Sequence, residues 1–334
     1  MTLGKRFVDS LKLLDKTIGE LRKNKYASIV PIQQFPLYYH ELYSSGLDRS
    51  ARFPVDRYKL LAEQLQAIDE DKLIAWHTPR LASRDEVLLV HKKDYVERFL
   101  NHQLLEKEIR RIGLRPWKDT IVERTLRLTG GALQAMEKIL VGDTTMAGNM
   151  AGGTHHAFRE EGSGYCIFND LAICVENALV ENHINRILIL DLDVHQGDGT
   201  AKIFHGDERV YTVSLHGKNN FPFRKQVSDW DIEFENDTGD EDYLNTLDQV
   251  LLKLSEKKFD LIFFQAGVDG LATDALGLLK LTREGLKKRN EKVFEWRKTI
   301  GLPMSIFMGG GYAKPIEDTI ESFTDLFMEV PRWL

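Results

Sequence analysis

Cysteine is scarce in this chain, where only Cys166 and Cys174 occur among 334 residues. Two cysteines exclude the disulfide framework that supports small secreted domains, and such scarcity is typical of a reducing compartment. We therefore expect a cytoplasmic protein in which both thiols are small buried hydrophobic groups.

Long apolar runs and dense basic stripes are also missing. No stretch approaches the ~20 apolar residues needed to span a bilayer, so no membrane span is expected. The formal net charge is -6, and no stripe of Lys and Arg with interleaved aromatic residues follows the chain. Direct binding to nucleic acid is therefore not expected.

The start of the chain carries an apolar stripe among lysines. Apolar residues recur there at spacings of three and four, at Phe7, Leu11, Leu14, Ile18 and Leu21. This spacing predicts an amphipathic helix, so we expect residues 1–27 to form a helical extension. Such a helix packs on its own domain or serves as a dimer contact or peripheral surface helix, which leaves a homo-oligomer open.

The rest of the chain alternates short apolar runs with longer segments of helical periodicity. Strands are predicted at residues 27–32, 86–91, 186–193, 210–216, 260–268 and 303–308. Helices are predicted at residues 55–67, 94–101, 119–139, 170–181, 242–257, 282–299 and 315–327, and the basic triplet Lys287-Lys-Arg289 is predicted to lie on the outer face of its helix. Apolar strands separated by helices indicate one α/β domain, residues 28–334, with a parallel sheet covered on both faces.

Two carboxylates and an imidazole follow the most apolar of these strands. Asp191, Asp193 and His195 stand two residues apart, so on an extended strand they share one face. Free charges at a buried strand end are costly, and a bound divalent cation is the usual way to satisfy them.

Other predicted strand ends and turns offer polar groups that could join this cluster. One strand leads into Gln265-Ala-Gly-Val-Asp269-Gly-Leu-Ala-Thr-Asp274, and another leads into Gly309-Gly-Gly-Tyr312. A glycine-rich turn carries His155 and His156, which can act as general acid and base. Because the carboxyl ends of parallel strands meet at one edge of a sheet, we expect these groups to converge.

Together these motifs resemble the zinc-dependent histone deacetylase superfamily, which also contains acetylpolyamine amidohydrolases and acetoin-utilisation proteins. The matching blocks are Arg52-Phe-Pro-Val-Asp56, Gly152-Gly-Thr-His-His156, Gly162-Ser-Gly-Tyr-Cys-Ile-Phe-Asn-Asp170, Asp191-Leu-Asp-Val-His-Gln-Gly-Asp-Gly-Thr200 and Gly309-Gly-Gly-Tyr312. Gln196 and residues 112–117 are more similar to the bacterial and class IV branch. The resemblance implies a three-layer α/β/α sandwich with a central parallel sheet of about eight strands, the arginase/deacetylase fold.

The resemblance implies that Asp193, His195 and Asp274 hold Zn²⁺, although Fe²⁺ accepts the same ligands. Asp269, at the strand end itself, is the alternative third ligand; the family spacing favours Asp274 and leaves Asp269 as a structural hydrogen bonder. Two carboxylates cancel the charge of the metal, so the metal lowers the pKa of bound water less than a neutral ligand set would, and a separate base is needed.

The implied reaction is hydrolysis of the amide of an acylated amine. His155 would contact Asp191 and His156 would contact Asp198, and each carboxylate would orient its ring and raise its basicity. His156 would take the proton from the attacking water while His155 helps to protonate the leaving amine. Tyr312 would donate its hydroxyl to the oxyanion.

The resemblance also implies a substrate tube and a second ion. Gly164, Tyr165 and Phe221 would line a narrow apolar tube around the methylene stem of the substrate, which suits acyl-lysine. A monovalent cation, usually K⁺, would be bound by backbone oxygens and one hydroxyl, from Asp191, Asp193, His195, Ser214 and Leu215.

Three alternatives stay open on the sequence alone. The first is a small-molecule deacetylase acting on acetylpolyamines or related amides, because no acidic loop residue that would grip a peptide backbone is recognisable. The second is an acyl-ligand sensor without turnover, which would normally have lost Tyr312 or a histidine. The third is a dinuclear arginase-like hydrolase, which would require Asp-x-His-x-Asp where this strand has Asp191-x-Asp-x-His195.

Overall fold

The computed structural model describes residues 33–45, 53–180 and 183–334. By contacts, the chain divides into Met1–Gln33 and a compact unit, Gln34–Leu334. The helical extension predicted over residues 1–27 and the strand predicted at 27–32 lie outside the described residues, so both stay predictions.

Among the described residues, one sheet of eight parallel strands forms the centre of the compact unit, in the order β2-β1-β3-β8-β7-β4-β5-β6. The strands are Phe35–Tyr38 (β1), Ile74–His77 (β2), Met146–Asn149 (β3), Ile187–Asp191 (β4), Val210–Gly217 (β5), Trp230–Phe234 (β6), Leu261–Gln265 (β7) and Met304–Phe307 (β8). The predicted central parallel sheet is confirmed.

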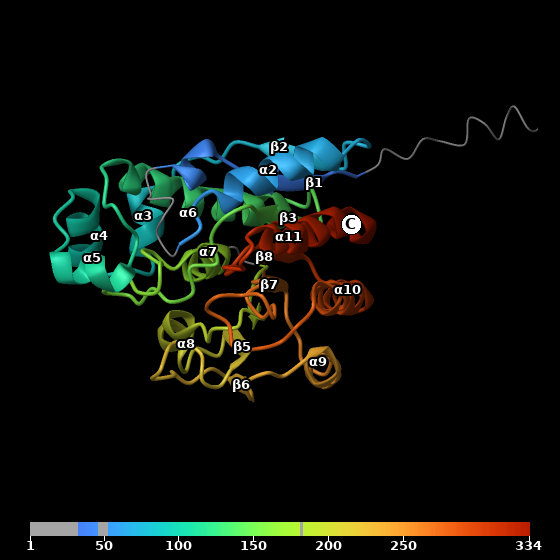
Figure 1. Cartoon of the computed structure of the whole chain (residues 1–334). Helices are drawn as coiled ribbons and strands as arrows, with labels where there is room; N and C mark the ends of the chain where they lie inside the picture. Colours follow the sequence, from blue (N-terminus) through green and yellow to red (C-terminus); the bar gives the residue numbers. More distant parts are fainter. Residues whose placement is uncertain (1–32, 46–52, 181–182) are drawn as a thin grey trace, which may run out of the picture. The chain divides into compact units, whose positions relative to one another are not determined.

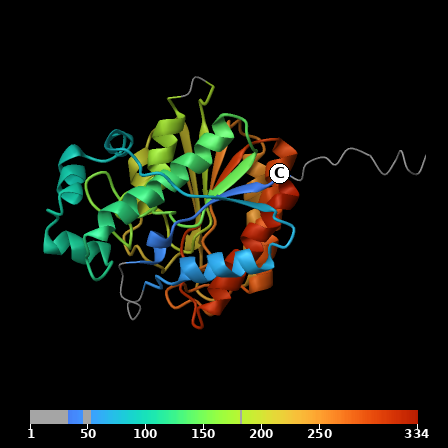
Figure 2. The same ribbon diagram turned by 90° about the horizontal axis from the view of Figure 1, so that it is seen from above.

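Helices cover both faces of this sheet (Figure 1). The helices are Arg57–Ile68 (α2), Arg84–Leu88 (α3), Lys93–Leu100 (α4), Glu106–Ile112 (α5), Thr120–Leu140 (α6), Asp170–Ala178 (α7), Asp198–Phe204 (α8), Asp240–Leu254 (α9), Arg283–Ile300 (α10) and Glu317–Glu329 (α11), with 3₁₀ turns at Glu41–Ser44 and Val330–Trp333. In Figures 1 and 2, α6, α7 and α8 lie on one side of the strands and α9, α10 and α11 on the other. The three-layer α/β/α sandwich is therefore confirmed.

The central strands β4 and β7 are buried along their whole length. Their sequences, Ile-Leu-Ile-Leu-Asp and Leu-Ile-Phe-Phe-Gln, are apolar apart from the last residue of each. The register pairs Asp191 with Gln265 on one side and with Ser214 on the other. Gln265 in turn pairs with Phe307, the last residue of β8. Because β4, β7 and β8 end at the same level, the polar residues that follow them share one edge of the sheet.

The strand predicted at residues 86–91 is wrong, because this segment begins in helix α3. The Ser83 side chain accepts a hydrogen bond from the Glu86 N–H, and the Glu86 carboxylate accepts one from the Ser83 N–H. This capping box starts a helix before the apolar run that suggested a strand.

Cys166 and Cys174 are both buried and unpaired, as expected for small hydrophobic groups. In the described parts of the chain, no helix has both the length and the apolar character to cross a membrane.

Candidate metal centre and active site

Two loops at the carboxyl edge of the sheet bring two carboxylates and an imidazole together. Asp193 and His195 follow β4, and Asp269 follows β7. Their ligand atoms lie within 4.8 Å of one another, and all three side chains are buried. His195 Nδ1 lies 3.1 Å from Asp193 Oδ1 and 3.0 Å from Asp269 Oδ2. This donor set fits a divalent cation that accepts nitrogen and oxygen ligands.

Asp274, the third ligand implied by the family spacing, is placed differently. One carboxylate oxygen accepts hydrogen bonds from the N–H groups of Leu276 and Gly277, both at 2.8 Å. The other accepts from the Tyr312 N–H at 2.7 Å. The structure therefore ties Asp274 to the tyrosine loop and groups Asp269 with Asp193 and His195, so Asp274 as third ligand stays a prediction.

The charges of this cluster are strongly coupled. Burial raises the pKa of Asp269, and the neighbouring charge of Asp193 adds to this, so that the pKa reaches about 7. Burial lowers the pKa of His195, but hydrogen bonds and charges from Asp193 and Asp269 outweigh it and raise the pKa to about 10. Crowded carboxylates in a buried site are offset by a bound cation, so the residues present fit a divalent metal.

Two histidine–carboxylate pairs lie beside the cluster. Nδ1 of His155 is 2.7 Å from the Asp191 carboxylate, and Nδ1 of His156 is 2.7 Å from the Asp198 carboxylate. All four side chains are buried. These are the two contacts that the resemblance implies. An ionised carboxylate only accepts, so Nδ1–H of each ring donates and Nε2 is left for proton transfer.

The two rings differ in their charge environment, although their centroids are only 4.1 Å apart. Burial lowers the pKa of His155, but Asp191 and Asp193 outweigh it and raise the pKa to about 9. Burial lowers the pKa of His156, the charge of His155 lowers it further, and the pKa falls to about 4. The His155–Asp191 pair therefore lies next to the Asp193 carboxylate, with His155 Nε2 3.9 Å from Asp193 Oδ1.

Tyr312 lies on the glycine loop after β8 and lines the same cavity as His155, His156, Asp193 and His195. Burial raises the pKa of its hydroxyl well above the usual value, so the group remains a proton donor at neutral pH. A residue not singled out from the sequence supports this loop: the Arg57 guanidinium donates hydrogen bonds to the carbonyl oxygens of Gly311 at 2.9 Å and Gly309 at 3.2 Å.

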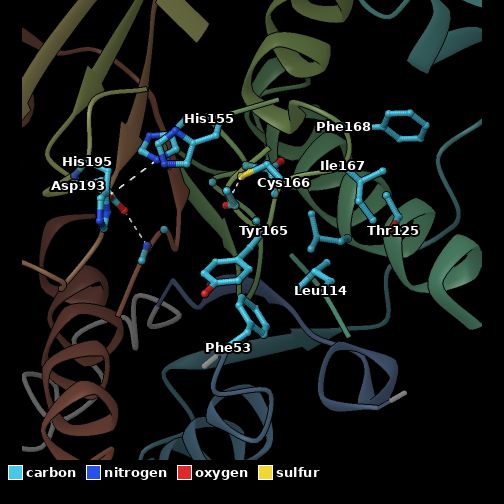
Figure 3. Close-up of a pocket in the computed structure, with 18 of the residues that line it drawn as sticks. Phe53, Leu114, Thr125, His155, Tyr165, Cys166, Ile167, Phe168, Asp193 and His195 are labelled. Carbon is cyan, nitrogen blue, oxygen red and sulfur yellow. Dashed lines mark hydrogen bonds and ion pairs between the residues drawn. The ribbon is translucent and has the colours of Figure 1, made fainter. Parts of the chain in front are cut away.

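The cavity has one end that carries the titratable cluster and another lined mainly by apolar side chains, with Thr125 among them (Figure 3). His155, Asp193 and His195 lie together at one end, whereas Leu114 and Ile167 lie away from them.

The predicted tube residues lie near the histidine pairs. Gly164 and Tyr165 line the cavity, whereas Phe221 is not among its lining residues and packs its ring 4.9 Å from the His156 ring. Gly164 has a φ of +53°, and a Cβ there would lie only 2.7 Å from His156 Cδ2. Only glycine fits at this position without pushing the His156 ring.

Gln196 fixes the loop that carries Phe221. The buried Gln196 amide donates to the Gln226 carbonyl at 2.8 Å and accepts from the Gln226 N–H at 2.8 Å. On the same loop, Lys225 Nζ donates to the carbonyl oxygens of Asn220 at 2.7 Å and Pro222 at 2.9 Å. The sequence does not predict either of these contacts. A hydrogen bond between a side chain and a backbone group produces no recognisable sequence motif, because any residue can supply the backbone partner.

The monovalent cation site stays a prediction. Ser214 lies opposite Asp191 in the β4–β5 register, and Leu215 is the next residue. The Ser214 hydroxyl lies 2.9 Å from His216 Nδ1.

Comparison with known proteins agrees with the fold. Residues 51–327 match the family model of the histone deacetylase domain. Similar proteins include an uncharacterised protein of Picosynechococcus, 42% identical over 86% of this chain and 95% of its own length. Others are histone deacetylase 2 of Arabidopsis thaliana, 28% identical over 88% and 80%, and the acetoin utilization protein AcuC of Staphylococcus xylosus, 29% identical over 82% and 76%. The chain belongs to the histone deacetylase family and is a hydrolytic deacetylase.

Proposed function

We propose that this deacetylase removes acetyl or other acyl groups from the side-chain amine of lysine in a peptide or protein. One observation carries the proposal: His155, His156, Asp193, His195 and Tyr312 line a single cavity. Hydrolysis of an amide requires a base for water, a proton for the leaving amine and a donor for the oxyanion, and these side chains supply all three.

Zn²⁺ is the proposed metal, and Fe²⁺ would accept the same donor set. Asp193 and His195 would hold it together with one carboxylate of the loop after β7, Asp274 by the family spacing or Asp269 by proximity. A divalent cation bound there supplies Lewis-acid polarisation of the acyl carbonyl and lowers the pKa of water.

The side chains of the chain itself carry out the proton transfers. We assign to His156, oriented by Asp198, the removal of the proton from the attacking water. His155, oriented by Asp191, helps to protonate the leaving amine. The Tyr312 hydroxyl, whose pKa is raised by burial, donates to the oxyanion that develops on the acyl group.

Lysine fits the proposed approach to the site. Gly164, Tyr165 and Phe221 would enclose a methylene stem, and burial of each CH₂ contributes about 0.8 kcal/mol. An amine with an unbranched stem places its amide at the end of the cavity that carries the titratable cluster while the stem contacts these apolar walls.

A substrate panel on the metal-loaded full chain tests the proposal. Acetate or acid release would be measured from an acetyl-lysine peptide, longer acyl-lysine peptides and acetylspermidine, with a chelator control. We expect the lysine peptides to have the highest kcat/KM. Preference for acetylspermidine would favour a small-molecule deacetylase, and binding without turnover would favour a sensor.

Metal stoichiometry separates the remaining alternative. A mononuclear hydrolase reaches full activity with a single divalent ion per chain, whereas an arginase-like enzyme requires two. Full activity only after a second equivalent would contradict the mononuclear site.

A further inference from the structure

Arg289 lies on the inner face of α10, not on the outer face that the basic triplet predicted. Its side chain is only 1% exposed, among the most buried large side chains of the described residues. A buried guanidinium requires acceptors for its five N–H groups, so the identity of those acceptors shows what the residue does.

The guanidinium joins the two loops that carry the proposed metal ligands. Nη1 donates to the carbonyl oxygens of Gly267 at 2.6 Å and Leu192 at 3.3 Å, and Nη2 donates to the Ala266 carbonyl at 3.1 Å. Leu192 directly precedes Asp193, and Gly267 lies two residues before Asp269. One rigid, planar group therefore spans the carboxyl ends of β4 and β7.

The remaining N–H groups bind the neighbouring Asn290. Nε and Nη2 donate to Asn290 Oδ1 at 3.1 and 2.9 Å. All of these acceptors are neutral, so hydrogen bonds leave the charge of the guanidinium uncompensated. Burial lowers the pKa of Arg289, and this shift is opposed first by Tyr243 and then by the charges of Asp269 and Asp193. The two carboxylates therefore favour the charged form of the buried arginine across the loop backbone.

We propose that Arg289 is a positioning residue that holds the two ligand-bearing loops at the separation required for metal binding. The inference rests on the proposed function, because the loops matter in this way only if they bind a metal. Residues that orient metal ligands without touching the metal typically contribute about 10–100-fold to metal affinity or activity. We expect the removal of Arg289 to lower metal affinity by about the same factor.

The same helix offers a matched control. Arg297 is 5% exposed and donates to three carbonyl oxygens, those of Leu302 at 2.5 Å, Trp333 at 2.9 Å and Thr145 at 3.2 Å. Thr145 directly precedes β3, so this arginine donates hydrogen bonds at the amino end of the sheet. Arg297 therefore has the same chemistry as Arg289 without contact to the proposed metal site.

The experiment compares full-length wild type, Arg289→Met and Arg297→Met. Zn²⁺ affinity would be measured by competition with a chromophoric chelator, and thermal unfolding of the metal-free proteins would report stability. We expect Arg289→Met to bind Zn²⁺ about 10–100-fold more weakly and, at saturating Zn²⁺, to lose kcat with little change in KM. Arg297→Met should lose comparable stability and keep the wild-type Zn²⁺ affinity.

The outcomes distinguish failure of the proposed metal site from failure of the proposed role of Arg289. No Zn²⁺ binding by the wild type would overturn the proposed metal site. Normal binding by the wild type with unchanged affinity in Arg289→Met, or an equal loss in Arg297→Met, would overturn the role of Arg289. If Arg289→Met does not fold, Arg289→Lys, which keeps the charge but cannot bridge both strand ends, should show the weaker binding; wild-type affinity in that variant would overturn the inference.

Discussion

The two ends of the central sheet carry similar polar residues but use them differently. At the amino end, the Asp260 carboxylate accepts the N–H groups of Asn185 and Arg186, and Arg297 donates to three carbonyl oxygens. At the carboxyl end, imidazoles and carboxylates pair with one another beside a cavity. Polar groups that satisfy the backbone stabilise the fold, whereas those that satisfy one another beside a cavity remain available for chemistry.

The comparison also shows why charge can gather at only one end. The carboxyl ends of β4 and β7 stop in register, so their loops bring Asp193 and Asp269 close together. A divalent cation bound there would offset that repulsion. The Arg289 guanidinium donates hydrogen bonds to backbone carbonyl oxygens of both loops. Changes at the carboxyl end should therefore alter metal binding and turnover, and changes at the amino end should alter stability alone.

The largest effect on turnover is expected from His156→Ala, which removes the proposed base. We expect kcat to fall by about 10²–10⁴-fold, because this is the usual contribution of a positioned acid or base. His91→Gln is the control, since His91 is buried but accepts a hydrogen bond from the Asn169 N–H outside the cavity. Steady-state kinetics on an acetyl-lysine peptide would measure both, and a kcat of His156→Ala within a few-fold of wild type would remove His156 from the mechanism.

Tyr312→Phe should have the next largest effect. Loss of one oxyanion donor lowers kcat by about 10²–10³-fold, and KM should change little because the donor acts in the transition state. Tyr165→Phe removes another hydroxyl from the same cavity and should lose far less. Equal losses in the two variants would show that Tyr312 has no special role.

The third metal ligand can be assigned by comparing Asp274→Asn with Asp269→Asn. The family spacing predicts that Asp274→Asn lowers Zn²⁺ affinity more, whereas the grouping of Asp269 with Asp193 and His195 favours the opposite order. In the variant with the weaker effect, Zn²⁺ affinity should fall by no more than about 10–100-fold, which is the usual loss when a residue that only orients a metal ligand is removed. Chelator competition measures both, and unchanged affinity in both variants would exclude this loop from the metal site.

A smaller effect is expected from Gln196→Ala, which releases the loop of Phe221 from the segment that carries Asp193 and His195. The variant loses about 1 kcal/mol of net hydrogen-bond energy, which corresponds to a change of roughly fivefold in an equilibrium constant. We expect KM to increase by about this factor while kcat stays nearly unchanged. Gln226→Ala is the control, because Gln226 takes part only through its backbone groups. An unchanged KM in Gln196→Ala would show that the loop is held by other contacts.

The smallest effect on activity is expected at the amino end. Asp260→Ala should lower the free energy of unfolding by about 1 kcal/mol, because two N–H groups lose their acceptor. Its kcat and KM should equal those of the wild type. Denaturant unfolding and kinetics would test this, and a loss of activity in the folded variant would end the distinction between the two ends of the sheet.

Much of the fold could be predicted because the central strands are short uninterrupted apolar runs. Strands β4, β7 and β8 fall within predicted segments and β5 extends only one residue beyond its own, to Gly217, whereas β1, β2, β3 and β6 are not predicted. The missed strands are four or five residues long and contain residues that weaken the strand pattern, such as Pro36, Gly148 and Glu233. Tertiary pairing, not local sequence, makes these segments strands.

The candidate site residues can be proposed from their sequence motifs. The residues that hold the loops of the site, such as Arg289, cannot. His155 and Asp191 stand in recognisable blocks, whereas Arg289 stands in a basic triplet that is typical of a solvated helix face. A signal was available: Leu286 and Val293, which flank Arg289 at helical spacing, share its buried face. The carbonyl partners of Arg289 come from distant segments, which no local pattern reveals.

Metal dependence of hydrolysis tests the central claim most directly. Full-length protein would be stripped with a chelator and titrated with Zn²⁺ while acetate release from an acetyl-lysine peptide is followed, with Asp193→Ala measured in parallel. We expect no turnover without metal, a plateau at a single equivalent per chain, and no recovery in Asp193→Ala at the same Zn²⁺ concentration. Full turnover by the metal-free protein, or full recovery in Asp193→Ala, would contradict the account.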